Sequence, residues 1–286
     1  MILIADSGST KTTWMEVASG NMIVTEGLNP HFTTDEQFLA ACKTVRQHFP
    51  LSTFHFPLFF YGAGCGNDSQ RERVEKMLTA ALRPEELHVE TDMLGACRAV
   101  SGTKESLVGI LGTGSNACHY DGRRIACQPV STGYVMGDNG SANHVGRILL
   151  NDYLTRRMPD DIRDRFHDAY PMTDDLFIDA VYHRPHPNRF LASLAPFAAS
   201  HQEEDYCSHV ILTALYDWHH GPLETLQQQA DYHEGLLNIV GGFAKAIEPS
   251  LRRYFADESI TIGTVVADPI EGLRRFHSDA DSQSIP

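Results

Sequence analysis

The feature that most constrains the fold is a strand-turn-strand segment that occurs twice. The first copy, "IADSGSTKTTW", covers residues 4–14, and the second, "ILGTGSNACHY", covers residues 110–120. At this offset of 106 residues, Gly114 falls on Gly8 and Tyr120 falls on Trp14. A repeat at such a spacing predicts an internal duplication, with two similar domains that each begin with a glycine turn.

The first copy is not a nucleotide-binding P-loop. That motif needs a glycine directly before the lysine and another glycine five residues earlier, with a helix starting at the lysine. Here Lys11 follows Thr10, and the only residues upstream of Asp6 are an apolar run. The residues after Lys11 are rich in β-branched and aromatic types, which predicts a second strand. The segment is therefore a predicted β-hairpin.

Composition narrows the class of partner. The chain has 286 residues, 42% of them hydrophobic, and a formal net charge of −14, which argues against nucleic acid or an anionic membrane as partner. Its six cysteines are scattered without a zinc-ligand spacing. The apolar N-terminus is too short for a signal peptide, and no apolar run is long enough to span a membrane. We expect a cytoplasmic protein whose partner is a small molecule.

Apolar runs alternate with amphipathic segments along the chain. Residues 2–26 predict three strands, and residues 34–101 predict alternating helices and strands. After the second glycine turn, the sequence predicts a third strand, a long helix, a polar helical region, and two further strands that each lead into a helix. This pattern indicates an α/β fold. We expect one domain at 1–105, joined by a C-terminal helix at 269–286, and a second at 106–268 with a helical insertion at about 160–235.

Four motifs follow one another in the chain: "IADSGSTKT", "ILGTGSN", "GYVMGDNGS" and "IVGGFA". Their combination resembles the actin-like ATPase and sugar-kinase superfamily, and within it the BadF/BadG/BcrA/BcrD-type ATPases and the N-acetylglucosamine kinases. The resemblance extends from residue 2 to about residue 275. It implies two duplicated ribonuclease H-like domains with a central cleft, ATP and Mg²⁺ as cofactors, and a small sugar as substrate. Relatives are often dimers, which makes a homodimer one expectation.

The resemblance assigns the first hairpin to the phosphates of ATP. Lys11 would add positive charge, and Asp6 would hold Mg²⁺ through water. Four residues would contact the β- and γ-phosphates through backbone N–H groups and hydroxyls: Ser7, Gly8, Ser9 and Thr10.

The resemblance also assigns two groups of glycines in the second half of the chain. Gly241 and Gly242 would let adenine and ribose stack on the backbone. Three residues of the second hairpin would lie against phosphate: Gly112, Thr113 and Gly114. Either hairpin taken alone is equally typical of an ordinary β-turn.

Asp92 is the expected catalytic base. It opens a predicted helix between the two repeats, and similar kinases place here the carboxylate that accepts the proton of the attacking sugar hydroxyl. A helix N-terminus lowers the pKa of a carboxylate, so we expect Asp92 to be ionised at neutral pH. An ordinary N-cap would explain an aspartate at this position equally well.

Four other residues would contact the sugar by resemblance: Asn29, Ser115, Asn116 and Asp138. Asp138 is suited to chelate vicinal hydroxyls, whereas Asn29 before Pro30 is also typical of a turn. Asn139 stands where close relatives usually carry an acidic residue, which removes one charge near the site.

The leading hypothesis is an ATP-dependent phosphotransferase acting on a small amino sugar, N-acetylglucosamine or a related N-acetylhexosamine. One alternative is an ATPase of the 2-hydroxyacyl-CoA dehydratase activator type, whose [4Fe–4S] cluster needs cysteine thiolates. No two cysteines are close in sequence, although lone cysteines from two subunits could meet. The other is a non-catalytic sugar sensor, which usually carries an added DNA-binding segment, and here the first strand begins almost at residue 1.

Overall fold

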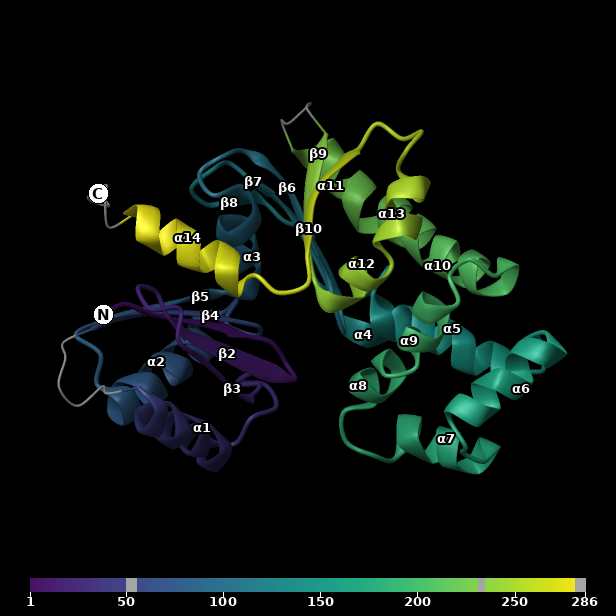
Figure 1. Cartoon of the computed structure of the whole chain (residues 1–286), viewed down its shortest axis with the longest axis horizontal. Coiled ribbons are helices and arrows are strands. Elements are labelled where there is room, and N and C mark those ends of the chain that lie inside the picture. The colour runs from purple at the N-terminus through teal and green to yellow at the C-terminus, as the bar shows by residue number, and fades with distance from the viewer. Residues whose placement is uncertain (50–55, 231–234, 281–286) are drawn as a thin grey trace. The chain divides into compact units, whose positions relative to one another are not determined.

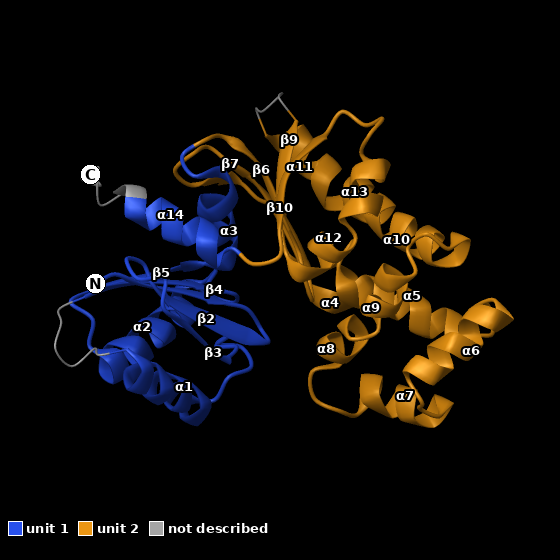
Figure 2. Ribbon diagram, in the orientation of Figure 1, with its two compact units in different colours: residues 1–103, 269–286 blue, residues 104–268 orange. Residues whose placement is uncertain are grey.

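The protein, described from a computed structural model over residues 1–49, 56–230 and 235–280, divides into two compact units (Figure 2). Unit 1 comprises Met1–Thr103 and Pro269–Pro286, and unit 2 comprises Lys104–Asp268. Each unit contains one five-stranded sheet covered by helices (Figure 1).

Unit 1 begins with a three-stranded meander and continues as alternating helices and strands. Its elements are β1 (Leu3–Ser7), β2 (Lys11–Glu16), β3 (Met22–Glu26), α1 (Asp35–His48), β4 (Pro57–Gly62), α2 (Asp68–Leu82), β5 (Glu86–Thr91), α3 (Asp92–Ser101) and α14 (Ile270–Ala280).

The sheet of unit 1 has the order β3-β2-β1-β4-β5. The meander strands pair antiparallel, whereas β1, β4 and β5 run parallel. Ser7 lies opposite Gly62, and Gly62 lies opposite Thr91, so these three strands end at one edge of the sheet. Neighbouring strands are about 4.8 Å apart, which places the ends of β1 and β5 about 10 Å from each other.

Alternate residues of β1 face two different hydrophobic clusters. Leu3 and Ala5 pack with apolar residues of α1 and α2, while Ile4 packs with Ile270 and Leu273 of α14. Figure 1 shows the corresponding layers, with α1 and α2 on one face of the sheet and α3 and α14 on the other.

Unit 2 repeats the meander and then carries a long helical region. Its elements are β6 (Ser106–Leu111), β7 (Ser115–Tyr120), β8 (Ile125–Cys127), α4 (Gly133–Met136), α5 (Ala142–Leu154), α6 (Asp160–Ala169), α7 (Asp174–Tyr182), α8 (Pro187–Ala192), α9 (Ala195–Ser200), α10 (Asp205–Trp218), the π-helix η1 (His219–Leu223), α11 (Glu224–Gln229), β9 (Leu236–Val240), α12 (Gly242–Ala246), α13 (Glu248–Tyr254) and β10 (Thr261–Val266).

The sheet of unit 2 has the same topology as that of unit 1. Its order is β10-β9-β6-β7-β8, with β6, β7 and β8 antiparallel and β6, β9 and β10 parallel. Each element of the first meander therefore has a counterpart in the second. The predicted α/β duplication is confirmed.

The composition of the helical region of unit 2 suggested a polar segment, but the structure shows that this region also has a hydrophobic interior. It buries an aromatic cluster that includes Phe166, Phe177 and Phe197, and Trp218 is also fully buried. The predicted long helix around residues 141–158 ends at Leu154. The helices α5 to α10 thus build the main core of unit 2 together with β6, β7 and β9.

Candidate functional site

The first predicted phosphate loop is a tight turn between β1 and β2. Its closing hydrogen bond runs from the Gly8 N–H to the Lys11 carbonyl at 2.9 Å, and the Gly27 N–H donates to the Thr10 carbonyl at 3.1 Å. Gly8 and Ser9 are partly exposed, while Thr10 and Lys11 are exposed. The turn therefore presents backbone and hydroxyl groups at the edge of the sheet.

Ser7 has a different place from the rest of this turn. Its hydroxyl is fully buried, accepts the Leu28 N–H at 3.1 Å, and lies 2.8 Å from the Thr12 hydroxyl. Thr12 donates its own hydroxyl proton to the Glu26 carbonyl, so Ser7 must be the donor to Thr12. The one hydroxyl proton of Ser7 is thus donated inside the protein, and the predicted contact of this residue with phosphate stays a prediction.

Two residues outside the hairpin fix its position. A Cβ on Gly27 would come within 2.5 Å of the Gly8 carbonyl oxygen, so the backbone of Gly27 lies directly against the turn. Asn29 is buried, donates through Nδ2 to the Ser9 hydroxyl at 3.2 Å, and accepts the His31 N–H through Oδ1 at 3.0 Å. The amide that we expected to contact a sugar thus also holds the first hairpin.

Asp92 is placed at the same edge of the sheet as the first hairpin. It is the first residue of α3, and the cap of that helix is Thr91, whose hydroxyl accepts the Leu94 N–H at 3.2 Å. Asp92 is partly exposed and accepts the Met93 N–H at 2.9 Å. It is therefore not needed as an N-cap.

The expected direction of the Asp92 pKa shift is wrong. Desolvation raises the pKa of Asp92 to about 6, and the hydrogen bond from Met93 offsets only part of that increase. The sequence showed the helix N-terminus, which lowers the pKa, but not the surrounding packing. Desolvation by that packing changes the pKa of Asp92 more than the backbone hydrogen bonds at the helix start do. The carboxylate is still mostly ionised at neutral pH, with a pKa suited to proton transfer.

The second hairpin, between β6 and β7, is joined to the start of α5. The Gly112 N–H donates to the Gly114 carbonyl at 2.9 Å and closes the turn. The Ala142 N–H donates to the Gly112 carbonyl at 2.9 Å, and the Asn143 N–H donates to the Thr113 carbonyl at 3.1 Å. The Asn143 side chain also donates to the Thr113 carbonyl, at 2.8 Å. Helix N–H groups that have no partner inside the helix thus hold the turn.

Asp138 lies directly over the second hairpin. One of its carboxylate oxygens accepts the Ser115 N–H at 3.2 Å, and the other accepts the Asn143 Nδ2 at 3.0 Å. A Cβ on Gly114 would come within 2.8 Å of this carboxylate. Burial, the largest effect, raises the pKa of Asp138, while the donors Ser115 and Asn143 offset part of it.

The other predicted residues of unit 2 lie near the second hairpin, at the same edge of the unit 2 sheet. Asn116 accepts the Ala117 N–H through Oδ1 at 2.9 Å, so its amide is held within the strand β7. A Cβ on Gly241 would come within 2.1 Å of the Leu111 carbonyl oxygen and 3.1 Å of the Gly112 N, which places the predicted adenosine motif against the second hairpin. Gly242 follows as the exposed first residue of α12.

Three glycines of the predicted nucleotide motifs are not required by the fold. A Cβ would meet nothing within 4 Å at Gly112 or Gly242, and only the Lys11 carbonyl oxygen at 3.8 Å at Gly8. None of the three has a left-handed backbone conformation. Their lack of a side chain keeps space open at the backbone, as phosphate and nucleoside groups in close approach would require.

The sequence reasoning missed two residues of the site. Asn143 is fully buried and joins Thr113 to Asp138, and its Oδ1 has no hydrogen-bond partner in the described part of the chain. Thr91 supplies the cap that we had considered for Asp92. Asn143 lies two residues after Ser141, which caps α5, and a polar residue directly after the cap of a strongly predicted helix was the available signal.

The residues described here contain no group of three or more His, Cys, Asp or Glu side chains that could hold a metal ion. Asp6, partly exposed at the end of β1 beside the hairpin, is a hard carboxylate of the kind that Mg²⁺ prefers. Mg²⁺ usually retains waters and shares its ligands with substrate phosphates, so a single carboxylate next to a phosphate loop fits that ion.

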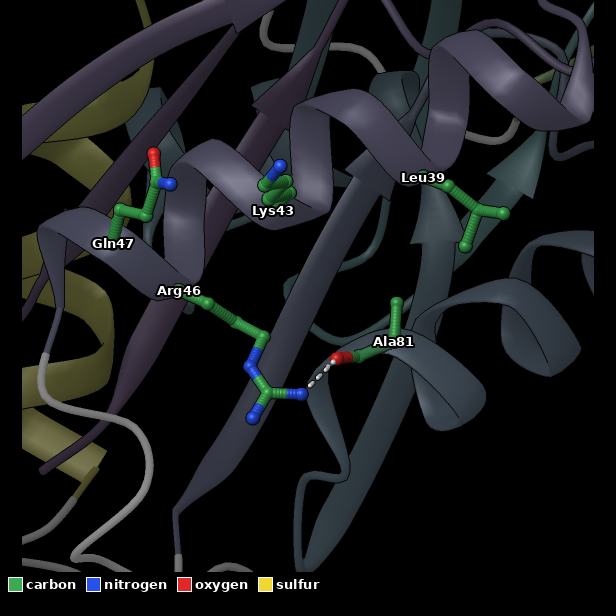
Figure 3. A pocket seen from close by; sticks show the side chains of 5 residues that line it. All are labelled: Leu39, Lys43, Arg46, Gln47 and Ala81. Atoms are coloured by element: carbon green, nitrogen blue, oxygen red, sulfur yellow. Dashed lines mark hydrogen bonds between the residues drawn. The ribbon is translucent and has the colours of Figure 1, made fainter.

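A shallow pocket of about 460 Å³ lies elsewhere, on α1 and α2 (Figure 3). The Arg46 guanidinium donates to the Ala81 carbonyl at 3.1 Å there, next to Lys43 and Gln47. This contact stabilises the C-terminal end of α2. None of the predicted site residues lines this pocket.

No helix in the part of the chain that the structure covers is long and apolar enough to cross a membrane. No protein-family model matches the sequence, and no curated protein is similar to it in sequence.

Solved structures are clearly similar. A proposed N-acetylglucosamine kinase from Porphyromonas gingivalis is 32% identical, with a TM-score of 0.90 over 98% of this chain and 100% of the other. A second proposed N-acetylglucosamine kinase, from Chromobacterium violaceum, is 16% identical, with a TM-score of 0.74 over 96% of this chain and 98% of the other.

A glucokinase of the ROK family from Streptomyces griseus, solved with glucose and AMPPNP, is 14% identical, with a TM-score of 0.57 over 98% of this chain and 99% of the other. At the identities of the second and third structures, the likeness shows the fold alone. The expected fold class, two α/β domains of the actin-like sugar-kinase type, is confirmed.

Proposed function

Because the chain belongs to the same family as the proposed N-acetylglucosamine kinase of P. gingivalis, we propose that it is an ATP-dependent sugar kinase. Within the superfamily we place it with the BadF/BadG/BcrA/BcrD-type proteins, on the order of its four motifs. The acceptor we propose is a hydroxyl of N-acetylglucosamine or a related N-acetylhexosamine. The observation that carries the proposal is the pair of duplicated glycine hairpins, at which Gly8 and Gly112 leave the backbone open.

We assign the phosphates of ATP to backbone N–H groups and hydroxyls of both hairpins. In unit 1, Gly8, Ser9 and Thr10 provide these groups, while Ser7 acts as the internal tie described above. In unit 2, Gly112, Thr113 and Gly114 do so, and Gly241 and Gly242 receive the adenosine. Lys11, exposed at the start of β2, adds positive charge.

Asp6 would hold Mg²⁺ through water. When bound, the ion neutralises charge on the phosphate oxygens. The transition state of phosphoryl transfer is loose, so positioning and electrostatics provide most of the rate enhancement.

Asp92 is the proposed catalytic base. Its carboxylate accepts the proton of the attacking sugar hydroxyl as the new O–P bond forms. With a pKa of about 6, the carboxylate is ionised at neutral pH. This pKa also lies close to neutral pH, which favours general base catalysis. We assign sugar contacts to Ser115, Asn116, Asp138 and Asn29, with the remaining amide N–H of Asn29 as donor.

The six cysteines disfavour the activator-type ATPase. Five are buried and only Cys127 is partly exposed, where its thiol donates to Gln229 at 3.5 Å. Ligands of a cluster shared between two subunits must reach the protein surface, and in the activator reading each subunit would have to supply two thiolates. One partly exposed cysteine does not meet that need.

The test is ADP release by the purified protein with Mg·ATP, measured with N-acetylglucosamine, glucosamine, N-acetylmuramate, N-acetylmannosamine, glucose, or no sugar. We expect strong stimulation by one N-acetylated amino sugar. Equal ADP release with and without every sugar would favour an ATPase, and no release in any mixture would favour a sensor.

A further inference from the structure

We propose that His144 is a positioning residue for the second hairpin, because its imidazole holds the turn that carries Asp138 against Ser115. This inference rests on the proposed function insofar as that hairpin binds the phosphates of ATP. The contacts that support it all lie within unit 2.

His144 is a buried residue in the first turn of α5 and is 5% exposed. Its Nδ1 accepts the Gly140 N–H at 3.2 Å, so in the neutral ring the proton must be on Nε2. That nitrogen lies 3.6 Å from the Asp217 carboxylate, near the end of α10. Burial and the charge of Arg147 lower the pKa of His144 to about 4, against the opposite effect of Asp217, which keeps the ring neutral at ordinary pH.

The turn held by His144 has an unfavourable backbone conformation. Asp138 has a φ of +52°, in the left-handed region that a residue with a side chain seldom adopts. Gly140 has a φ of +78°, and a Cβ there would come within 2.7 Å of the Trp218 Cβ. The Trp218 side chain therefore packs against the Cα of Gly140, and His144 holds the N–H of the same glycine. Such a conformation persists only where the surroundings hold it.

The turn transmits this restraint to the hairpin. The Ser141 N–H donates to the Asp138 carbonyl at 3.1 Å, and the Asp138 carboxylate accepts from Ser115 and Asn143. Asn139 adds a second link to α10 by donating to the Asp217 carbonyl at 3.3 Å. The neutral imidazole thus accepts the Gly140 N–H of the turn through Nδ1 and places Nε2 beside the end of α10.

Three substitutions separate the two nitrogens of His144. His144→Asn places an amide oxygen close to the position of Nδ1 and keeps the acceptor for Gly140. His144→Gln reaches the position of Nε2 and keeps the group facing Asp217, but loses that acceptor. His144→Leu removes both. His119→Gln is the matched control, because His119 is also buried and lies 2.8 Å from Glu105, at the end of β7 away from the hairpin.

The first measurement is the dissociation constant of Mg·ATP by calorimetry. We expect His144→Gln and His144→Leu to weaken binding about tenfold, which corresponds to one ordinary hydrogen bond, while His144→Asn and the control stay within about twofold of wild type. Wild-type affinity in a folded His144→Leu or His144→Gln, or an equal loss in His144→Asn and His144→Gln, would overturn the proposal.

The second measurement is amide hydrogen exchange at Gly140 and Ser115, which does not depend on ATP. We expect faster exchange in His144→Gln than in His144→Asn, and wild-type exchange in the control. Identical exchange in all variants would overturn the positioning role. A wild-type protein that binds no ATP but shows the expected exchange pattern would contradict the proposed function and leave the role of His144 in place.

Discussion

The Thr91 hydroxyl accepts the Leu94 N–H at 3.2 Å and caps α3, so the adjacent Asp92 begins the helix without serving as its cap. Desolvation raises the pKa of this carboxylate, which means that the fold gains nothing from its charge. An ionisable group kept at a cost in stability is typical of a functional site.

The substitution Asp92→Asn should therefore separate activity from stability. We expect kcat to fall by about 10² to 10⁴, the usual contribution of general base catalysis, while the KM for the sugar changes little. The thermal unfolding midpoint at pH 7 should equal or exceed that of wild type, because a neutral side chain avoids the cost of burying charge. Glu90→Gln, a substitution of another partly exposed acid nearby on β5, is the control and should keep near-normal kcat. Near-normal turnover of folded Asp92→Asn would exclude Asp92 as the base.

The pH dependence of kcat/KM should report the ionisation of the Asp92 carboxylate. With a pKa of about 6, Asp92 loses its ability to accept a proton as the pH falls through that value, so kcat/KM should decrease tenfold per pH unit below about pH 6. The folded protein also binds this proton more tightly than the unfolded chain, so ionising Asp92 lowers stability as the pH rises from about 4 to 6. A profile that is flat from pH 7 down to pH 5 would contradict this assignment.

Alanine substitutions at two glycines at the same edge of the sheet of unit 2 should affect different properties: ligand binding at Gly112 and folding stability at Gly241. At Gly112 an added Cβ meets nothing within 4 Å, so Gly112→Ala should change the free energy of unfolding by less than about 0.5 kcal/mol and yet weaken Mg·ATP binding. At Gly241 the φ is +142° and the Leu111 carbonyl oxygen lies 2.1 Å from the Cβ position, so Gly241→Ala should cost about 3 kcal/mol or more. Urea unfolding and ATP calorimetry measure the two effects. Undiminished ATP affinity in Gly112→Ala would remove this glycine from the phosphate site.

The C-terminal helix should be essential to the stability of unit 1. Leu273 is fully buried beside Ile4 and Met15, so Leu273→Ala should destabilise the protein by about 2 to 5 kcal/mol. Arg275→Ala, at an exposed position on the same helix, should change stability by less than about 0.5 kcal/mol. Urea denaturation distinguishes these outcomes, and equal stability of the two variants would show that α14 is not packed on the sheet.

The sequence was informative wherever a local pattern determines the structure. The strand-glycine-strand repeat identified both hairpins and their common topology, because alternation and turn chemistry act over a few residues. The start of α3 at Asp92 was predicted for the same reason.

Properties that depend on tertiary packing were not predictable in this way. The helix N-terminus at Asp92 can be read from the local sequence, but the desolvation that raises the pKa of this carboxylate depends on the packed structure. The Ser7 hydroxyl looked available until Leu28 and Thr12 were seen to use it. Asn143 could be noticed in the sequence only as a polar residue near the start of a predicted helix, whereas its contacts with Thr113 and Asp138 show what it does.

The central claim is tested most directly by following the γ-phosphate of ATP. With [γ-³²P]ATP, Mg²⁺ and N-acetylglucosamine or a related N-acetylhexosamine, label should appear in a sugar phosphate, and it should disappear from that product in Asp92→Asn. Label that appears only as inorganic phosphate, at the same rate with and without sugar, would contradict the account.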